Sequence, residues 1–252
     1  MITKLIRGIK GLFMTVLFGM FLGGIFVELF LVLPLIWCLE KIYGPEPDRM
    51  QRSHRILLSF WIEMLELCGL LSAKPAIGKP FDGPCVVISN HPGLFDVLFL
   101  IRDIPRLSVL VKRTLAKKLP LGPIFRSAGY ILSTDVEENS PVSTMLDAAE
   151  KIRRGYKFLI FPEGSRSPKG GLRKFKVGAF RIARMMNVPV QPVLIRNIPP
   201  FIPKEDKWYL PPWKISRLEM EYWEPILPPQ LGKEKEYARR LENRYKHVLG
   251  FT

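Results

Sequence analysis

The chain has 252 residues, enough for one large globular domain or two small ones. Lys and Arg outnumber Asp and Glu by 38 to 23, which gives a formal net charge of +15 at pH 7. Such an excess favours a polyanionic partner, either a nucleic acid or an anionic membrane surface. The three histidines lack the spacing of metal ligands, and the three cysteines are too few for a disulfide framework. Composition therefore argues against a metal enzyme and a disulfide-rich domain, and we expect the cysteines to be small buried residues.

A long apolar stretch at residues 11–39 contains a single charged side chain, that of Glu28. About 20 apolar residues suffice to cross a bilayer, so this stretch predicts membrane association. Cations flank it on both sides: Lys4, Arg7 and Lys10 precede it, and Lys41 follows it. It is too long for a cleaved signal peptide and lacks a small-residue cleavage site. The glycine pair at 23–24 and Glu28 leave two geometries open, a single tilted span and a hairpin within one leaflet. A buried core helix is the alternative.

Downstream of this stretch, residues 48–72 have the apolar spacing of a helix, and from residue 76 onward strand and helix patterns alternate. Strands are predicted at 85–90, 107–112, 129–134, 157–161, 188–195 and 214–223. Helices are predicted at 94–102, 114–119, 141–154, 175–187 and 233–248. This alternation predicts an α/β fold with a largely parallel central sheet flanked by helices. We divide the chain into a membrane-associated helical segment, 1–75, and an α/β domain, 76–252.

A histidine and an aspartate interrupt the apolar sequence at the first of these strand-to-helix breaks. His91 follows the strand at 85–90, and Asp96 falls in the first turn of the next helix, with Pro92 and Gly93 between them. The carboxylate can fold back onto one imidazole nitrogen, which fixes the tautomer and leaves the other nitrogen as a base. That base could activate a hydroxyl of a bound substrate. The alternative is a helix-capping aspartate beside an unrelated loop histidine.

A second polar loop, in "LIFPEGSRS" at residues 159–167, follows another buried strand. It carries Glu163, Gly164, Ser165 and Arg166, and backbone amides around a glycine together with an arginine suit a phosphate or carboxylate. Further cations follow at Arg173, Lys174 and Lys176. Both loops come at strand ends, where ligands collect in α/β sheets. A solvated basic loop is the alternative.

These motifs resemble those of the glycerolipid acyltransferases, the 1-acyl-sn-glycerol-3-phosphate acyltransferase family. "NHPGLFD" resembles the H-x-x-x-x-D block of the family, and "FPEGSRS" resembles its F-P-E-G-T-R-S block with serine in place of threonine. "VPVQPVLI" resembles the proline-containing fourth block, and residues 109–129 resemble the connecting segment with its lysine, here Lys112. The resemblance runs from about residue 84 to 196 in the order of the family.

The resemblance implies an enzyme that transfers a fatty acyl group from a thioester, acyl-CoA or acyl carrier protein, to the hydroxyl of a lysophospholipid. The leading acceptor is 1-acyl-sn-glycerol-3-phosphate, in phospholipid synthesis, and no cofactor beyond the thioester co-substrate is implied. His91 would be the general base and Asp96 its orienting partner. The residues predicted to bind substrate are Asn90, Lys112, Glu163, Gly164, Ser165, Arg166 and Lys176, with Arg166 as the phosphate ligand.

One block departs from the family. Its second motif ends in an Asp-Arg pair, whereas "GYILSTD" places Thr134 and Asp135 there. An aspartate repels a phosphate, so either Arg126 or Lys112 supplies the cation or the acceptor carries no phosphate. The same chemistry on a non-phosphate lipid, such as an amino-acid lipid or another lipid hydroxyl, is therefore the alternative.

The non-enzyme alternative is a basic membrane-binding protein. We expect membrane lipids as partners and no nucleic acid, because no nucleic-acid motif occurs and the apolar N-terminal stretch does not fit such a protein. No G-x-S-x-G motif of a serine hydrolase is present. The expected location is the inner membrane of a bacterium, with the catalytic domain facing the cytoplasm. The oligomeric state is left open.

Overall fold

The structure is a computed structural model that describes residues 2–44, 48–117, 121–133, 141–202 and 214–251. The apolar N-terminal stretch forms one continuous helix built from α1 (Ile2–Val27), a π-helical segment η1 (Glu28–Val32) and α2 (Leu33–Tyr43). The chain does not turn back at residues 23–24, so the hairpin geometry is not adopted. From Gly8 to Tyr43 the helix is long and apolar enough to cross a membrane, and 17% of its most apolar window is buried. This low burial argues against a core helix.

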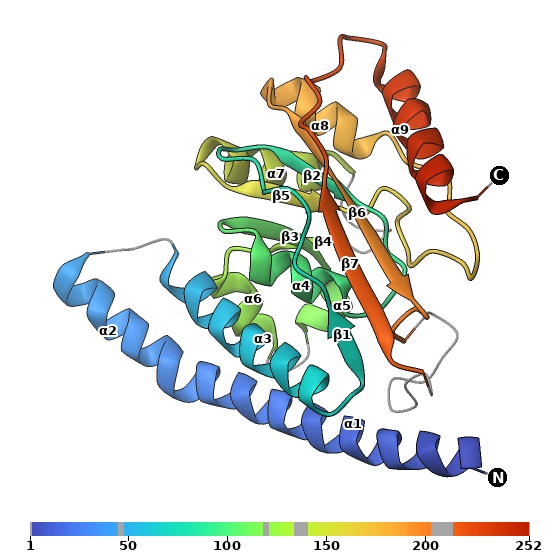
Figure 1. Cartoon of the computed structure of the whole chain (residues 1–252). Coiled ribbons are helices and arrows are strands. Elements are labelled where there is room, and N and C mark those ends of the chain that lie inside the picture. The colour runs from blue at the N-terminus through green and yellow to red at the C-terminus, as the bar shows by residue number, and fades with distance from the viewer. Residues whose placement is uncertain (1, 45–47, 118–120, 134–140, 203–213, 252) are drawn as a thin grey trace.

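Helix α3 (Arg49–Leu67) lies beside the N-terminal helix and joins it to the rest of the molecule (Figure 1). The indole Nε1 of Trp61 donates to the carbonyl of Leu17 at 3.1 Å. The buried carboxylate of Glu28 accepts from Ser53 Oγ at 2.8 Å and lies 3.1 Å from His54 Nε2. A polar contact thus fixes the otherwise apolar helix against α3.

The predicted helix at 48–72 ends earlier than expected, because Gly69 adopts a φ of +65° and turns the chain into a short strand, β1 (Leu71–Ala73). The other strands are β2 (Val86–Ser89), β3 (Leu107–Lys112), β4 (Ile131–Ser133), β5 (Lys157–Ile160), β6 (Val190–Ile198) and β7 (Ser216–Tyr222). Across the described residues they form one sheet in the order β1-β7-β6-β2-β5-β3-β4. All neighbours are parallel except β6 and β7. The predicted α/β fold with a largely parallel sheet is confirmed.

Helices cover both faces of the sheet (Figure 1). Beside α1 and α3, they are α4 (Asp96–Asp103), α5 (Arg113–Ala116), α6 (Leu121–Ser127), α7 (Pro141–Arg153), α8 (Gly178–Met186) and α9 (Glu234–Leu249). Successive residues of β2 point to opposite faces: Val87 belongs to the core cluster that includes side chains of α1, α3 and α4, whereas Val86 and Ile88 belong to the cluster that includes side chains of α7, α8 and α9. This two-sided burial explains why β2 is apolar without alternation.

The cysteines differ in part from expectation. Cys85 is buried, Cys68 is half-buried, and Cys38 is exposed on α2. The expectation that all three are buried is therefore confirmed for Cys85 only; Cys68 meets it in part, and it is wrong for Cys38, which lies on an outward-facing side of α2. Burial raises the pKa of the Cys85 thiol to about 12, so this thiol is not a nucleophile near neutral pH.

Candidate active site

The first polar loop brings His91 and Asp96 together at the carboxyl end of β2. His91 follows the strand, Pro92 and Gly93 break the chain direction, and Asp96 opens α4. The imidazole Nδ1 lies 3.1 Å from Oδ2 of the fully buried Asp96 carboxylate. Since Nδ1 faces the carboxylate, Nε2 is the ring nitrogen that remains to accept a proton.

Asp96 is held from two further directions. Its Oδ2 accepts from the backbone N–H of Gly93 at 2.6 Å, and its Oδ1 accepts from the side-chain amide of Asn197 at 3.4 Å. A Cβ atom at Gly93 would lie 2.6 Å from the carbonyl oxygen of Phe201, so glycine is required here. The segment after β6 thus packs closely on the His91 loop and helps to orient the carboxylate.

The ring of His91 stacks on Phe161, the residue after β5, with ring centroids 4.1 Å apart and an 18° angle between the planes. Strands β2 and β5 are parallel neighbours, so their carboxyl ends lie at the same edge of the sheet. Side chains 70 positions apart in sequence are therefore packed face to face. The stacking fixes the imidazole plane in addition to the Asp96 contact.

Glu163 connects the two polar loops. Its buried carboxylate accepts through Oε1 from the backbone N–H of His91 at 3.1 Å and from Ser167 Oγ at 2.7 Å. Through Oε2 it accepts from the backbone N–H of Arg173 at 2.9 Å. The loops are joined again where the Ser167 N–H donates to the His91 carbonyl at 2.8 Å. Both carboxylate oxygens of the predicted substrate ligand Glu163 are thus engaged by donors of the protein.

Cations lie in and beside this second loop. Gly164 has a φ of +70°, and a Cβ atom there would come within 2.8 Å of Lys176 Nζ, so this ammonium group lies directly over the glycine. Half-buried Arg166 donates through Nη1 to the carbonyl of Ile202 at 3.1 Å, and its own carbonyl accepts from Arg173 Nε at 3.1 Å. Arginine and lysine near a positive-φ glycine form a setting that suits an anion.

Comparison with known proteins identifies the segment that carries this site. Residues 72–196 match the family model described as Acyltransferase. Over these residues the chain belongs to the acyltransferase family.

Two curated relatives and one solved structure show which acyltransferases the chain is similar to. The chain is 32% identical over 128 residues to 1-acyl-sn-glycerol-3-phosphate acyltransferase beta of Homo sapiens, which covers 50% of this chain and 46% of the relative. It is 31% identical over 131 residues to the putative 1-acyl-sn-glycerol-3-phosphate acyltransferase acl-2 of Caenorhabditis elegans, covering 51% and 46%. The chain therefore spans about half the length of these curated relatives.

The solved structure is the crystal structure of the 1-acyl-sn-glycerophosphate (LPA) acyltransferase PlsC from Thermotoga maritima. It matches with a TM-score of 0.77 and 22% sequence identity over 97% of this chain and 96% of that chain. At this identity the likeness establishes a shared fold, and it extends over the N-terminal helix as well as the sheet.

The remaining predicted ligands of this acyltransferase segment occupy different settings. The side-chain amide of buried Asn90 donates to the carbonyl of Ile195 and accepts from its N–H, both at 2.8 Å, which ties the His91 loop to β6. Ser165 is half-buried between Gly164 and Arg166. Lys112 ends β3, and its side chain is outside the described part of the structure. Thr134 and Asp135 of the divergent second motif also lie outside the described residues.

Three contributors to the acyltransferase site were not identified from sequence. Phe161 carries no functional group and so has no chemical signature, whereas Asn197 lies near the end of β6. Tyr245 comes from α9, and its buried hydroxyl lies 3.1 Å from the Ile88 carbonyl and 3.0 Å from the Val193 carbonyl, bridging β2 and β6. A polar pair near the end of an apolar strand, Arg196 and Asn197 in "VLIRN", is the one signal that could have pointed to Asn197. Among the described residues no cluster of three His, Cys, Asp or Glu side chains could hold a metal ion.

Proposed function

We propose that the protein is a membrane-bound O-acyltransferase that acylates the hydroxyl of a lysophospholipid, with 1-acyl-sn-glycerol-3-phosphate as the leading acceptor. The observation that carries this proposal is the contact between His91 and the buried Asp96 at the edge of the sheet, within the acyltransferase segment. The relatives that match this segment are named 1-acyl-sn-glycerol-3-phosphate acyltransferases.

In this mechanism Nε2 of His91 takes the proton of the acceptor hydroxyl as its oxygen attacks the carbonyl carbon of an acyl thioester. Asp96 stabilises the imidazolium that forms, without itself accepting the proton. When the tetrahedral intermediate collapses, the carbon–sulfur bond breaks and the imidazolium returns its proton to the thiolate of the leaving group. The donor is a thioester of coenzyme A or of acyl carrier protein, and no metal or cofactor takes part.

Arg166 and Lys176 are proposed as ligands of the acceptor phosphate. Both lie at the loop that Glu163 attaches to His91, so an anion held there would bring a neighbouring hydroxyl close to the imidazole. The second candidate is acylation of a lipid that carries no phosphate. Asp135 favours it, because this carboxylate stands where the family motif has an arginine.

Membrane association through the N-terminal helix is part of the proposal. The apolar segment Gly8–Tyr43 is 36 residues long, or about 54 Å at 1.5 Å per residue, well beyond the ~30 Å hydrocarbon core. Because α3 packs along this helix, a perpendicular crossing would carry α3 into the bilayer, which favours insertion along one leaflet. Residues 1–75 then form the membrane-associated part and 76–252 the catalytic part. Free cysteines fit a catalytic part in the reducing cytoplasm, at the inner membrane of a bacterium.

Labelled acyl transfer tests the proposed function. Full-length protein in membranes is incubated with radiolabelled acyl-CoA or acyl carrier protein and with lysophosphatidic acid, and labelled phosphatidic acid is quantified. We expect His91→Ala to lower turnover by roughly 10²- to 10⁴-fold. His247→Ala, on the exposed surface of α9, is the matched control and should leave turnover unchanged. Near-normal turnover by the His91 variant would refute the mechanism.

A further inference from the structure

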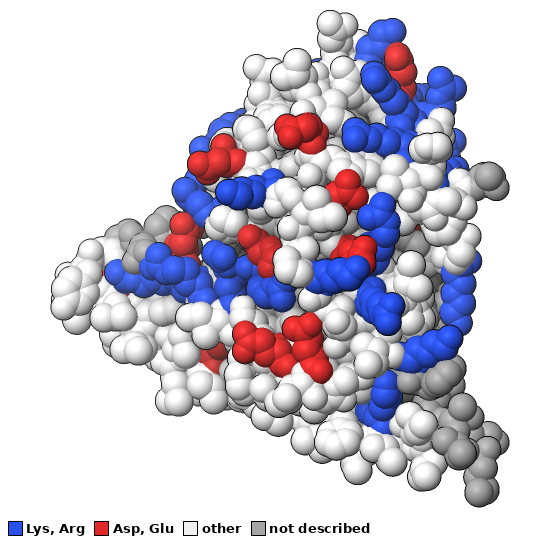
Figure 2. Space-filling model, in the orientation of Figure 1, with Lys and Arg blue, Asp and Glu red and all other residues white. Residues whose placement is uncertain are grey.

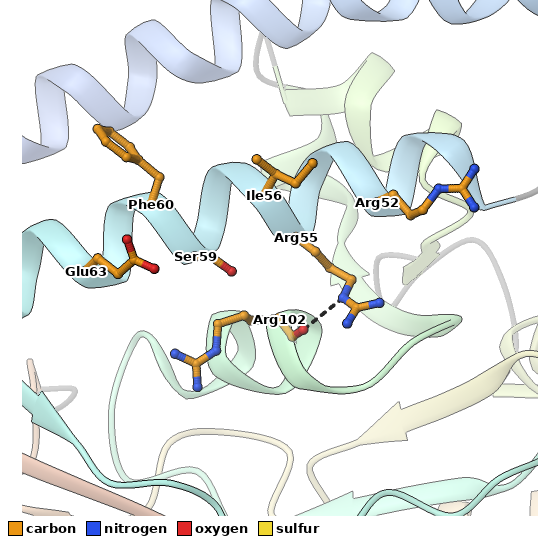
Figure 3. Close-up of a pocket in the computed structure, with 7 residues that line it drawn as sticks. All are labelled: Arg52, Arg55, Ile56, Ser59, Phe60, Glu63 and Arg102. Carbon is orange, nitrogen blue, oxygen red and sulfur yellow. Dashed lines mark hydrogen bonds between the residues drawn. The ribbon is translucent and has the colours of Figure 1, made fainter.

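A groove with a volume of about 500 Å³ lies between α3 and α4, formed by residues that take no part in the site described above (Figure 3). Three of its lining residues are arginines, and one is a carboxylate. The lining residues are Arg52, Arg55, Ile56, Ser59, Phe60, Glu63 and Arg102. The groove therefore combines an excess of positive charge with two apolar side chains and a hydroxyl.

Two of the arginines are held in place by bonds that use only part of their donors. Arg55 of α3 donates through Nε to the carbonyl of Arg102 on α4 at 2.9 Å (Figure 3). Arg102 is paired with Asp103 through Nε at 2.5 Å and Nη2 at 3.2 Å. A guanidinium has five N–H donors, so these bonds leave most donors of both groups for a ligand. Fixed guanidinium groups bind an anion with little loss of side-chain entropy.

The apolar side chains of the groove border the N-terminal helix. Ile56 and Phe60 project from α3 on the side facing that helix, whereas Arg55 and Ser59 project toward α4 (Figure 3). Ile56 is 72% exposed and Phe60 is 49% exposed. The neighbouring Leu57 packs against Gly24 of α1, so Ile56 and Phe60 flank the contact between the two helices.

The groove is thus continuous with a large apolar surface. Exposed side chains of the N-terminal helix include Phe26, Val27, Phe30 and Leu31. Figure 2 shows that the lower edge of the molecule, where α1 and α2 run in Figure 1, is almost free of charge. Lys and Arg side chains form a band above this edge, and in the middle of the view a group of Asp and Glu side chains lies between the edge and the band. A membrane bound to the apolar edge would bring its phosphate layer to the level of the arginines.

We propose that this groove binds the headgroup phosphate of an anionic phospholipid of the membrane on which the protein lies. Arg55 and Arg102 donate hydrogen bonds to the phosphate oxygens, and Ile56 and Phe60 contact the upper part of the acyl chains. The ligand needs both features at once, a phosphate and an adjoining alkyl chain, because charged and exposed apolar side chains line the same groove. This site is separate from the acyl-transfer site, so the inference rests on membrane association and not on the proposed reaction.

Binding of a short-chain lipid to the full-length protein in a non-ionic detergent tests the proposal. Dioctanoyl phosphatidylglycerol is the probe, because it is neither substrate nor product of the proposed reaction, and native mass spectrometry gives its apparent Kd. The double variant Arg55→Gln/Arg102→Gln should weaken binding by on the order of tenfold or more. The control Arg239→Gln/Arg240→Gln removes the same charge from exposed positions of α9 and should have no effect.

A second variant is expected to bind the lipid probe more tightly, a result that misfolding of the protein cannot produce. Glu63→Gln removes the carboxylate from the lining and should tighten binding by up to about fivefold, the size of an exposed charge interaction. Glu236→Gln, on α9, makes the same charge change elsewhere and should not alter the Kd. If the double arginine variant does not fold, this pair decides the question.

Four outcomes would overturn the proposal. One is unchanged affinity in the arginine variant, and another is an equal loss in the α9 control. A third is displacement of the lipid by glycerol 3-phosphate at the same concentration, which would mean that a free phosphate suffices. The fourth is that the double arginine variant loses binding to acyl carrier protein but keeps its affinity for the lipid, which would assign the groove to a protein partner. His91→Ala should bind the probe like the unaltered chain, so failure of the proposed function is distinguishable.

Discussion

The side-chain amide of Asn197 donates to Oδ1 of Asp96 at 3.4 Å, the carboxylate oxygen that His91 does not contact. The carbonyl oxygen of the same amide accepts from the backbone N–H of Phe201 at 3.2 Å, which fixes the amide orientation. Asn197 is therefore a positioning residue that holds the Asp96 carboxylate in the plane that presents Oδ2 to the imidazole.

We expect Asn197→Ala to lower kcat by roughly five- to tenfold with little change in the acceptor KM, since one long hydrogen bond to a charged group is lost. Asn197→Asp should lower kcat further. A second carboxylate there would repel Asp96 and turn its Oδ2 away from the imidazole, so the aspartate variant should lose more activity than the alanine variant. Steady-state kinetics of acyl transfer between pH 5 and 9 measures both variants. Asn243→Ala on the exposed surface of α9 is the control, and equal losses in both alanine variants would exclude a positioning role.

Glu163 should prove more important for stability than for acceptor binding. Its two oxygens accept three hydrogen bonds from the protein, so Glu163→Ala leaves buried donors without partners. The expected loss in free energy of unfolding is about 2 to 5 kcal/mol. Thermal unfolding in detergent measures it, with exposed Glu224→Gln as the control. A Glu163 variant with unchanged stability and a raised acceptor KM would instead support direct contact with substrate.

Variants of Arg166 test whether the acceptor carries a phosphate. Arginine binds a phosphate through two parallel hydrogen bonds, whereas lysine offers a point charge. Arg166→Ala should raise the KM for lysophosphatidic acid by roughly ten- to hundredfold, and Arg166→Lys should recover part of that loss. Kinetics with lysophosphatidic acid and with a lysolipid lacking a phosphomonoester measure the difference.

The divergent second motif provides an independent check of the same question. Asp135→Arg restores the residue type of the family and should improve the use of lysophosphatidic acid if its phosphate is recognised, since an attractive charge replaces a repulsive one. Competition between lysolipids in one assay gives the ratio of kcat/KM values. An unchanged KM in Arg166→Ala, together with lower activity of Asp135→Arg, would favour the non-phosphate acceptor.

The N-terminal helix should hold the protein on membranes through apolar contact. We expect the full-length chain to remain in the membrane pellet in 1 M salt and to be released by detergent, because salt screens charges over a few ångströms but leaves apolar burial intact. Sedimentation after salt washing and immunoblotting of both fractions provide the measurement. Complete release by salt would mean that the cationic surface, rather than the helix, carries the attachment.

The sequence by itself predicted the fold class and most of the elements, because burial on both faces and turn residues at strand ends are local properties of the chain. The strand at 107–112 and the helix at 141–154 agree with β3 and α7 to within a residue. The H-x-x-x-x-D and F-P-E-G blocks identified the loops of the site, since their residue types are close together in sequence. Helix α6 was not predicted, because Gly122 and Pro123 are poor helix formers.

The tertiary structure decided what depends on contacts between distant segments. Strand β1 is three residues long and is stable only because β7, more than 140 positions later, pairs with it. The N-terminal helix is attached to α3 at Glu28 because folding brings Ser53 and His54 of α3 into contact with this carboxylate. Glu163 and Asn90 were predicted from the sequence to bind substrate. In the structure the hydrogen bonds of Glu163 join the His91 loop to the loop after β5, and those of Asn90 join it to β6. A linear pattern records which groups a chain carries, whereas folding decides which of them are used by the protein's own backbone and which remain for a ligand.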